Sequence, residues 1–241
     1  MAASGIFLLF ILFACVVGLV AYLGYLQAKK RREEFAAAAA QREWTYTDRD
    51  DRWTERFQGA PFGTGQDRRA LNILQGKRDG RQFVAFDYRY STTSTTTDGQ
   101  GHTQTHTTVH PYSVVAVNVG SVLPELSVSP EGFFGRMVGR LTNRDIELES
   151  EDFNRAFTVT CPDRKFASDV LHPQMMEYLL TMPQLAWRFT GDSLLAVHQG
   201  DHSIAEVDTK LGQIDGILDR VPEFVWRAVQ PSATDPTPPA N

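Results

Sequence analysis

The feature that most constrains this chain is an uninterrupted apolar segment close to its N-terminus. Ile6 to Leu26 spans 21 positions without a charged side chain. Because a helix rises about 1.5 Å per residue, this segment covers the roughly 30 Å of a bilayer's hydrocarbon core. Tyr22 and Tyr25 lie near its end, where aromatic rings favour the headgroup layer. The segment therefore predicts one membrane-spanning helix.

A signal sequence or a soluble core helix fits this segment less well. A cleaved signal peptide has a basic start and a shorter apolar core, whereas no Lys or Arg precedes this segment. A lipoprotein signal ending at Cys15 would place the bulky Phe13 within its motif. A buried helix of a soluble protein is rarely apolar on every face for this length.

Basic residues directly after the segment predict its orientation. Positive flanks stay on the cytoplasmic side, so the N-terminus is expected outside and the rest of the chain in the cytoplasm. The chain is then a single-pass protein of the cell membrane. The same residues are expected to contact anionic headgroups, at about 1 kcal/mol each. They are Lys29, Lys30, Arg31 and Arg32.

Composition divides the chain into four parts. Residues 1–28 form the transmembrane anchor. Residues 29–43 are basic and Ala-rich, contain neither Gly nor Pro, and predict a helical stalk. Residues 44–230 are expected to form one cytoplasmic domain. Residues 231–241 form a Pro-rich tail that cannot build a core and is expected to be disordered.

The pattern of residues 44–230 predicts an α+β fold with a largely antiparallel sheet and packed helices. Gln82 to Tyr90 and Tyr112 to Val119 both alternate as strands do, with the turn signal Asp98-Gly99 between them. They predict a long hairpin whose Thr- and His-rich end projects from the sheet. Further strands are expected at Leu126 to Val128 and Asp145 to Leu148.

The second half adds helices. Short ones are expected at Arg164 to Leu171 and Gln174 to Thr181, and a longer one begins at Ser203, which forms a capping box with Glu206. The long helix carries apolar residues at alternating three- and four-residue steps, which suit a core helix or a coiled coil. We favour packing within the chain and keep weak homo-oligomerisation as the alternative.

Three histidines, His102, His106 and His110, form the most tempting ligand group. Their Thr-rich surroundings predict strands, in which successive histidines lie about 13 Å apart. One zinc ion has bonds of about 2 Å, so it would not be reached by all three. No metal site is predicted.

No other residue is assigned a catalytic or cofactor-binding role. Cys161 stands alone, and Gly63-Thr64-Gly65 lacks the Lys and hydroxyl residue of a phosphate loop. Glu147, Glu149 and Glu151 suit a solvent-facing strand edge. The formal charge of −5 gives no reason to expect nucleic acid as a partner.

Phe133 to Arg144 is a further candidate for membrane contact. If the segment is helical, its apolar residues share one face and Arg136, Arg140 and Arg144 line the edge. That layout suits a helix lying on a membrane surface, with arginines at the headgroups. Core packing with arginines reaching to solvent is the alternative, and it is favoured because Gly135 and Gly139 weaken a helix.

The block Leu148 to Leu179 resembles a family of uncharacterised bacterial membrane-anchored proteins. Phe153, Phe157, Pro173 and Met175-Met176-Glu177 carry the resemblance. It implies a domain attached to membrane spans and supplies no site residue.

Together these features predict a membrane-tethered interaction or scaffold module without a cofactor. Its partners would be membrane lipid, through the N-terminal helix, and another protein. The alternative is an enzyme or a lipid- or small-ligand-binding domain at the inner face of the membrane. An enzyme is disfavoured because no set of polar motifs converges on one place.

Overall fold

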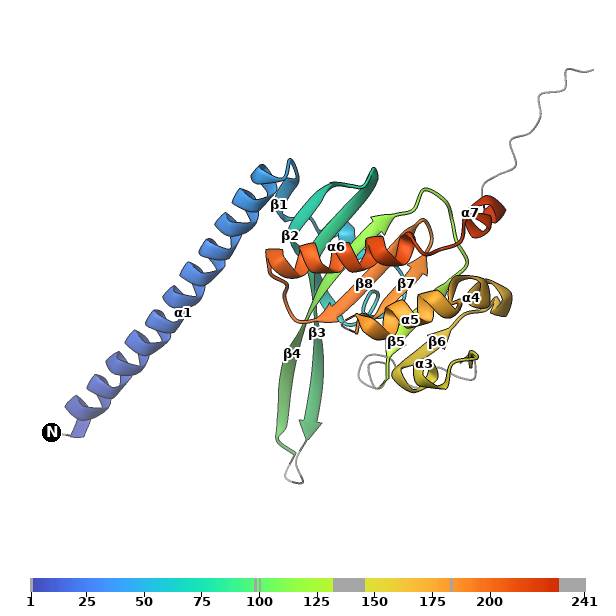
Figure 1. Ribbon diagram of the computed structural model, residues 1–241. Helices are drawn as coiled ribbons and strands as arrows, with labels where there is room; N and C mark the ends of the chain where they lie inside the picture. The colour runs from blue at the N-terminus through green and yellow to red at the C-terminus, as the bar shows by residue number, and fades with distance from the viewer. Residues whose placement is uncertain (1, 98, 100, 132–145, 183, 230–241) are drawn as a thin grey trace, which may run out of the picture.

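The computed structural model describes residues 2–97, 99, 101–131, 146–182 and 184–229, with side chains from residue 11 onward. Helix α1, Ala2–Gln41, runs without a break through the predicted anchor and stalk and extends away from the rest of the molecule (Figure 1). Its apolar part has a mean hydropathy of 2.0 and is not covered by other residues. Among the described residues this helix alone is long and apolar enough to cross a bilayer, which is compatible with a single-pass anchor.

The described strands form one eight-stranded antiparallel sheet, in the order β1-β2-β3-β4-β8-β7-β5-β6. The α+β prediction is confirmed. The strands are β1 Thr45–Arg49, β2 Gln66–Arg78, β3 Arg81–Thr97, β4 Thr103–Asn118, β5 Leu126–Pro130, β6 Phe157–Thr160, β7 Trp187–Thr190 and β8 Ser193–Gln199.

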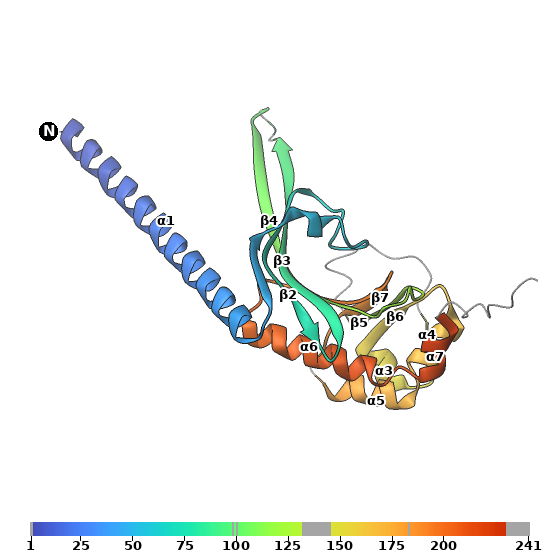
Figure 2. The same ribbon diagram turned by 90° about the horizontal axis from the view of Figure 1, so that it is seen from above.

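Both faces of the sheet are covered. The five described helices after β5 pack against one face (Figure 2), and a shorter segment around η1, Asp51–Thr54, covers part of the other. Side chains alternate between the faces along β3: Phe83 and Ala85 join the helix side, while Val84 and Phe86 face the η1 side. The helices are α3 Glu151–Ala156, α4 Arg164–Val170, α5 Pro173–Thr181, α6 Ile204–Leu218 and α7 Glu223–Val229.

Helix α6 lies across the sheet, and its capping box is present as predicted between Ser203 and Glu206. Val207, Leu211 and Ile214 are fully buried in the core. The apolar seam therefore packs within the chain, as favoured, instead of facing solvent as a coiled-coil seam would.

The projecting hairpin is also confirmed. β3 and β4 pair continuously from Phe83 with Val117 to Thr97 with Thr103. β2 pairs with β3 only as far as Ser91, and β8 pairs with β4 only from Tyr112 onward. Beyond these points the hairpin is a two-stranded ribbon with exposed side chains that stands clear of the sheet (Figure 1).

The strand expected at Asp145 to Leu148 is wrong for its described residues, because Ile146 to Leu148 have no strand geometry. Among these three residues, Ile146 N–H donates to the Val159 carbonyl at 2.9 Å, and none of the three belongs to a strand. The other segment proposed for membrane contact, Phe133 to Arg144 with Arg136, Arg140 and Arg144, lies outside the described residues.

The last turns of α1 are part of the folded core. Phe35 and Ala39 belong to the same apolar cluster as α6 and the helix side of the sheet, and Ala38 is buried as well. Trp44, just after the helix, packs edge-on against Phe83 of β3 at 4.8 Å between ring centroids. The predicted stalk is therefore held against the domain along its second half.

Candidate functional site

The place where α1 meets the sheet holds the most unusual residue of the described chain, a fully buried carboxylate in the middle of β3. Asp87 has no exposed surface. Its neighbours Phe86 and Tyr88 face the η1 side of the sheet, so strand alternation turns Asp87 toward α1 and α6. A buried carboxylate is costly unless it is paired and hydrogen-bonded, so its partners define the site.

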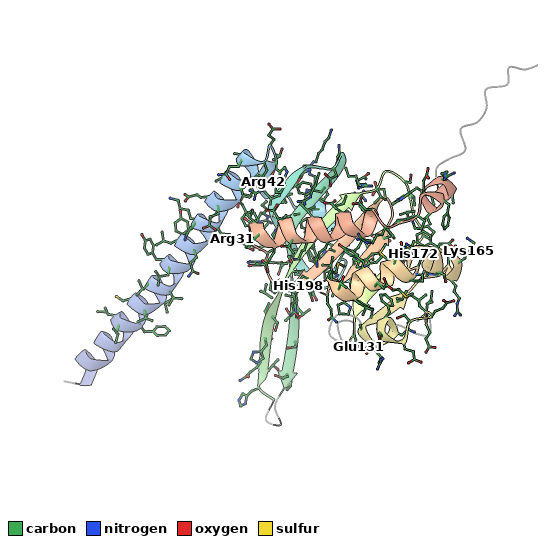
Figure 3. The ribbon with its side chains drawn as sticks, viewed as in Figure 1. Arg31, Arg42, Glu131, Lys165, His172 and His198 are labelled. Atoms are coloured by element: carbon green, nitrogen blue, oxygen red, sulfur yellow. The ribbon has the colours of Figure 1, made fainter. Side chains whose placement is uncertain are left out.

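Arg31 of α1 is the principal partner of Asp87. Its Nη1 lies 2.8 Å from Asp87 Oδ2, and its Nη2 donates to Asp87 Oδ1 at 3.1 Å. Such a two-pronged contact fixes the orientation of both groups as well as their distance. Nη2 also donates to the backbone carbonyl of His202 at 2.6 Å. Figure 3 shows Arg31 where α1 passes the start of α6.

A second donor reaches Asp87 from β2. Asn72 Nδ2 donates to Asp87 Oδ2 at 2.7 Å. Asn72 has a positive φ of 50° and lies where the β2–β3 register shifts between Leu71 and Leu74. Asn tolerates this left-handed conformation better than most residues, and the bulge aims its side chain at the carboxylate. Tyr46 then donates its hydroxyl to Asn72 Oδ1 at 3.1 Å.

His202 closes the site from the loop before α6. Its side chain is completely buried, and its ring lies 5.6 Å from that of Phe35. Nδ1 is 3.4 Å from Asp87 Oδ1, but neither ring nitrogen has hydrogen-bond geometry to a partner among the described residues. Burial lowers the pKa of His202 to about 4, although Asp87 acts in the opposite direction. The imidazole is therefore neutral at pH 7. We call Arg31, Asn72, Asp87 and His202 the junction cluster.

An open groove of about 720 Å³ lies beside the junction cluster. One wall is the face of α1 from Gln27 to Ala38, and the other is the segment from Asp201 to Glu206. Its volume falls within the range of small-ligand sites. Lys30 and Arg31 bring positive charge, but Arg31 is paired with Asp87, and Glu34, Asp201 and Glu206 bring negative charge. The groove therefore offers no net attraction to a simple anion.

A serine and a lysine form a second buried polar pair on the same side of the sheet. Lys210 of α6 donates to Ser113 Oγ of β4 at 2.7 Å, and burial lowers the pKa of the Lys210 ammonium. Ser-Lys pairs act as nucleophile and base in some hydrolases. Catalysis also needs an accessible hydroxyl, and Ser113 has no exposed surface. In this conformation the pair satisfies two buried polar groups and offers no route for a substrate.

The four basic residues after the apolar segment have different surroundings. Lys29 and Lys30 are exposed and face Glu33 and Glu34, each at 3.8 Å along the helix. Arg32 is 3.2 Å from Asp48 of β1. Of these four residues, Arg31 alone contacts the junction cluster in the described structure. Contact of these residues with headgroups stays a prediction.

The histidines of the hairpin are spread along it. His106 pairs across the ribbon with Ser94, whereas His110 stacks on Tyr90 at 4.8 Å and lies 2.8 Å from Thr92 Oγ1. Among the described residues no group of three or more His, Cys, Asp or Glu side chains could hold a metal ion. Cys161 is buried, donates its thiol to the Asp163 carbonyl and has a pKa raised by burial.

Sequence reasoning missed the junction cluster. The sequence feature that could have indicated the cluster is the carboxylate of Asp87 within an otherwise largely apolar strand. Its partners come from positions 31, 72 and 202, and no spacing rule connects them.

Comparison with known proteins bears on both the fold and the family resemblance. The crystal structure of the mycobacterial trehalose monomycolate transport factor A, TtfA, is similar with a TM-score of 0.56, over 79% of this chain and 96% of that one. The two are 14% identical, so the likeness shows a shared fold. No curated protein matches the chain in sequence. Residues 96–208, which include the block Leu148 to Leu179, match the family described as "Protein of unknown function (DUF3137)", and the predicted resemblance to an uncharacterised family is confirmed.

Proposed function

We propose that this chain is a membrane-anchored accessory module that positions a sheet domain at the membrane surface for a membrane-embedded partner in lipid transport. One observation carries the proposal: α1 runs unbroken from the apolar segment into the domain core, where Arg31 is paired with Asp87. A helix that served only as a tether would not need to pair with a buried carboxylate of the domain. This one fixes the domain relative to the anchor.

The lipid-transport part of the proposal is supported by the likeness to TtfA, which is named as a transport factor for trehalose monomycolate. The interaction part is supported by the polar hairpin, which stands clear of the core.

Depletion of the chain tests the proposal. Transfer of a labelled membrane lipid between the two leaflets or to an outer layer should slow, and the full-length chain should restore it. A form with Ile6 to Leu26 replaced by an unrelated span of equal length should also restore transfer, because the span acts as an anchor. A form released from the membrane should not. Normal lipid transfer after depletion would refute the transport role.

The open groove beside the junction cluster favours a second candidate function, the binding of a small ligand or a single lipid headgroup. Its walls combine Phe35 and Ile204 with charges of both signs, a lining that suits a zwitterionic headgroup better than an anion. Nanodiscs of defined composition, each holding the full-length chain, would show this as selective retention of one lipid class. A Glu34→Gln variant should change this retention, since it removes one charge from the groove without touching the junction cluster.

A further inference from the structure

The free end of the β3–β4 hairpin extends on the same side of the domain as the apolar part of α1. In Figure 1 both run downward from the sheet, and in Figure 2 both run upward. The two elements are in contact at their bases, through Arg31 and Asp87. The hairpin therefore runs from the level of Arg31 in the direction that leads toward the bilayer.

Residue counts give the reach of each element. Asp87 to Thr97 is ten steps along the strand, or about 33 Å at about 3.3 Å per step. Arg31 to Leu26 is five steps along the helix, or about 8 Å. Even if the two directions diverge by about 45°, the hairpin end passes the level of Leu26 by about 15 Å. The hydrocarbon core is about 30 Å thick, so the hairpin end reaches well into its depth.

The chemistry of the hairpin is incompatible with lipid at that depth. Residues 91–108 contain no apolar side chain, and most of them are Thr or Ser. Past Ser91 and before Tyr112 neither outer edge of the ribbon is paired with another described strand. Unpaired backbone groups are not tolerated in hydrocarbon, where only helices and closed barrels satisfy them. The hairpin end must therefore lie in water or against polar protein.

We infer that the hairpin end enters a polar, water-accessible cavity at bilayer depth in an integral membrane protein with several spans. This inference deepens the proposed function and rests on it. Its partner surface carries hydrogen-bonding groups, because the hairpin offers hydroxyls, imidazoles and open strand edges with Asp98 as its single carboxylate. Open edges also allow the partner to add a strand, which supplies affinity through the backbone.

Site-specific photo-crosslinking in native membranes tests this inference on the full-length chain. One form carries the crosslinking residue at Thr95, which is exposed near the hairpin end, and a control carries it at Lys77, which is exposed at the opposite end of the sheet. Thr95 should give adducts with a multi-span protein, at peptides within or next to its spans. Lys77 should give none of these adducts.

A shortened hairpin provides the depth control. Deletion of Thr93 to Thr96 and Gln104 to Thr107 removes four residues from each arm, which keeps the register and the alternation of faces. A crosslinker at Thr97 should then attach about 13 Å nearer the membrane surface of the partner than it does in the full hairpin.

The remaining crosslinking results separate the two proposals. Adducts of Thr95 confined to loops outside the membrane would leave the accessory role intact and overturn insertion at bilayer depth. Adducts with lipid alone would overturn the polar cavity. No adduct from Thr95, in a chain shown to be membrane-bound and folded, would overturn the insertion and remove the hairpin's support for the accessory role.

Discussion

Arg31 Nη1 lies 2.8 Å from Oδ2 of Asp87, and this contact joins the helix that carries the apolar segment to the centre of the sheet. Asp87 is fully buried, whereas the Arg31 side chain keeps about a quarter of its surface exposed. Loss of the contact would therefore leave the Asp87 carboxylate without solvent, whereas the Arg31 guanidinium could still be hydrated. Because Asp87 needs this partner, the contact holds α1 in one direction relative to the domain.

Removal of Arg31 should destabilise the domain strongly. Arg31→Ala leaves Asp87 buried with Asn72 as its main donor, and loss of one partner of a buried ion pair costs about 3–5 kcal/mol. Denaturant unfolding of the full-length chain in detergent measures the effect. The matched control is Arg32→Ala, whose pair with Asp48 is exposed and contributes about 0–1 kcal/mol. Equal losses from the two variants would contradict the role assigned to Asp87.

His202 should make the fold sensitive to mild acid. Burial lowers its pKa from the ordinary 6.5 to about 4, so the unfolded chain binds the proton more tightly than the folded chain. The stabilisation is complete above pH 6.5 and is lost as the pH falls from 6.5 to about 4, by up to about 3 kcal/mol.

The measurement is the difference in unfolding free energy between pH 7 and pH 5, compared with a His202→Leu variant. That variant should lose much of the pH dependence, whereas His106→Ala on the exposed hairpin should keep it. Carboxylates with lowered pKa values, such as Glu206, contribute at lower pH, and the comparison between variants removes their share. An unchanged pH profile in His202→Leu would disprove the assignment.

The Ser113–Lys210 pair should behave as a structural contact. Lys210→Met leaves the Ser113 hydroxyl buried without its partner, at a cost of about 1–3 kcal/mol. The double variant Ser113→Ala, Lys210→Met should recover most of that loss, because both polar groups are gone. A double-mutant cycle in denaturant measures the coupling. Covalent labelling of Ser113 by a fluorophosphonate would instead support the enzyme alternative.

The outer hairpin should contribute little to stability. The exposed arms bury almost no surface against the core, so the four-residue deletion from each arm should change the free energy of unfolding by less than about 1 kcal/mol. Thermal unfolding checks this. Leu211→Ala in α6 is the contrasting control, because Leu211 is fully buried and its truncation should cost about 2–5 kcal/mol. A large loss on shortening would show that the arms pack against something.

Reporter fusions test the orientation of the chain across the membrane. The basic flank Lys29 to Arg32 predicts that the domain is cytoplasmic. A C-terminal reporter that is active only in the cytoplasm should work, and one that is active only after export should not. The opposite pair of results would reverse the predicted topology.

Local signals are enough to predict much of the fold. The alternation in β3 and β4, the Asp98-Gly99 turn between them and the capping box of Ser203 each depend on residues close in sequence. The sequence predicts a strand at Phe157 to Thr160, and these residues form β6. The four-residue spacing of Phe153 and Phe157 also suits one shared helix face. Their rings do stack at 5.0 Å, but Phe157 begins β6, because α3 ends at Ala156. Such a short helix lies below the length at which periodicity is informative.

The junction cluster is beyond sequence reasoning for a physical reason. Asp87 and His202 are far apart in sequence, and by sequence Arg31 is one of four similar basic residues. Burial distinguishes Arg31 from Lys29 and Lys30, and burial there depends on how α1 crosses the sheet. That crossing is a tertiary feature without a local pattern.

The burial of Phe35, Ala38 and Ala39 changes where a soluble recombinant fragment should begin. A fragment starting at Trp44, the boundary suggested by composition, would expose the apolar surface that these side chains cover. It would also remove Arg31, the main partner of Asp87. One starting at Lys29 keeps both and leaves out the whole apolar segment Ile6 to Leu26. For this molecule, the smallest unit suited to crystallisation or NMR includes the second half of its own anchor helix.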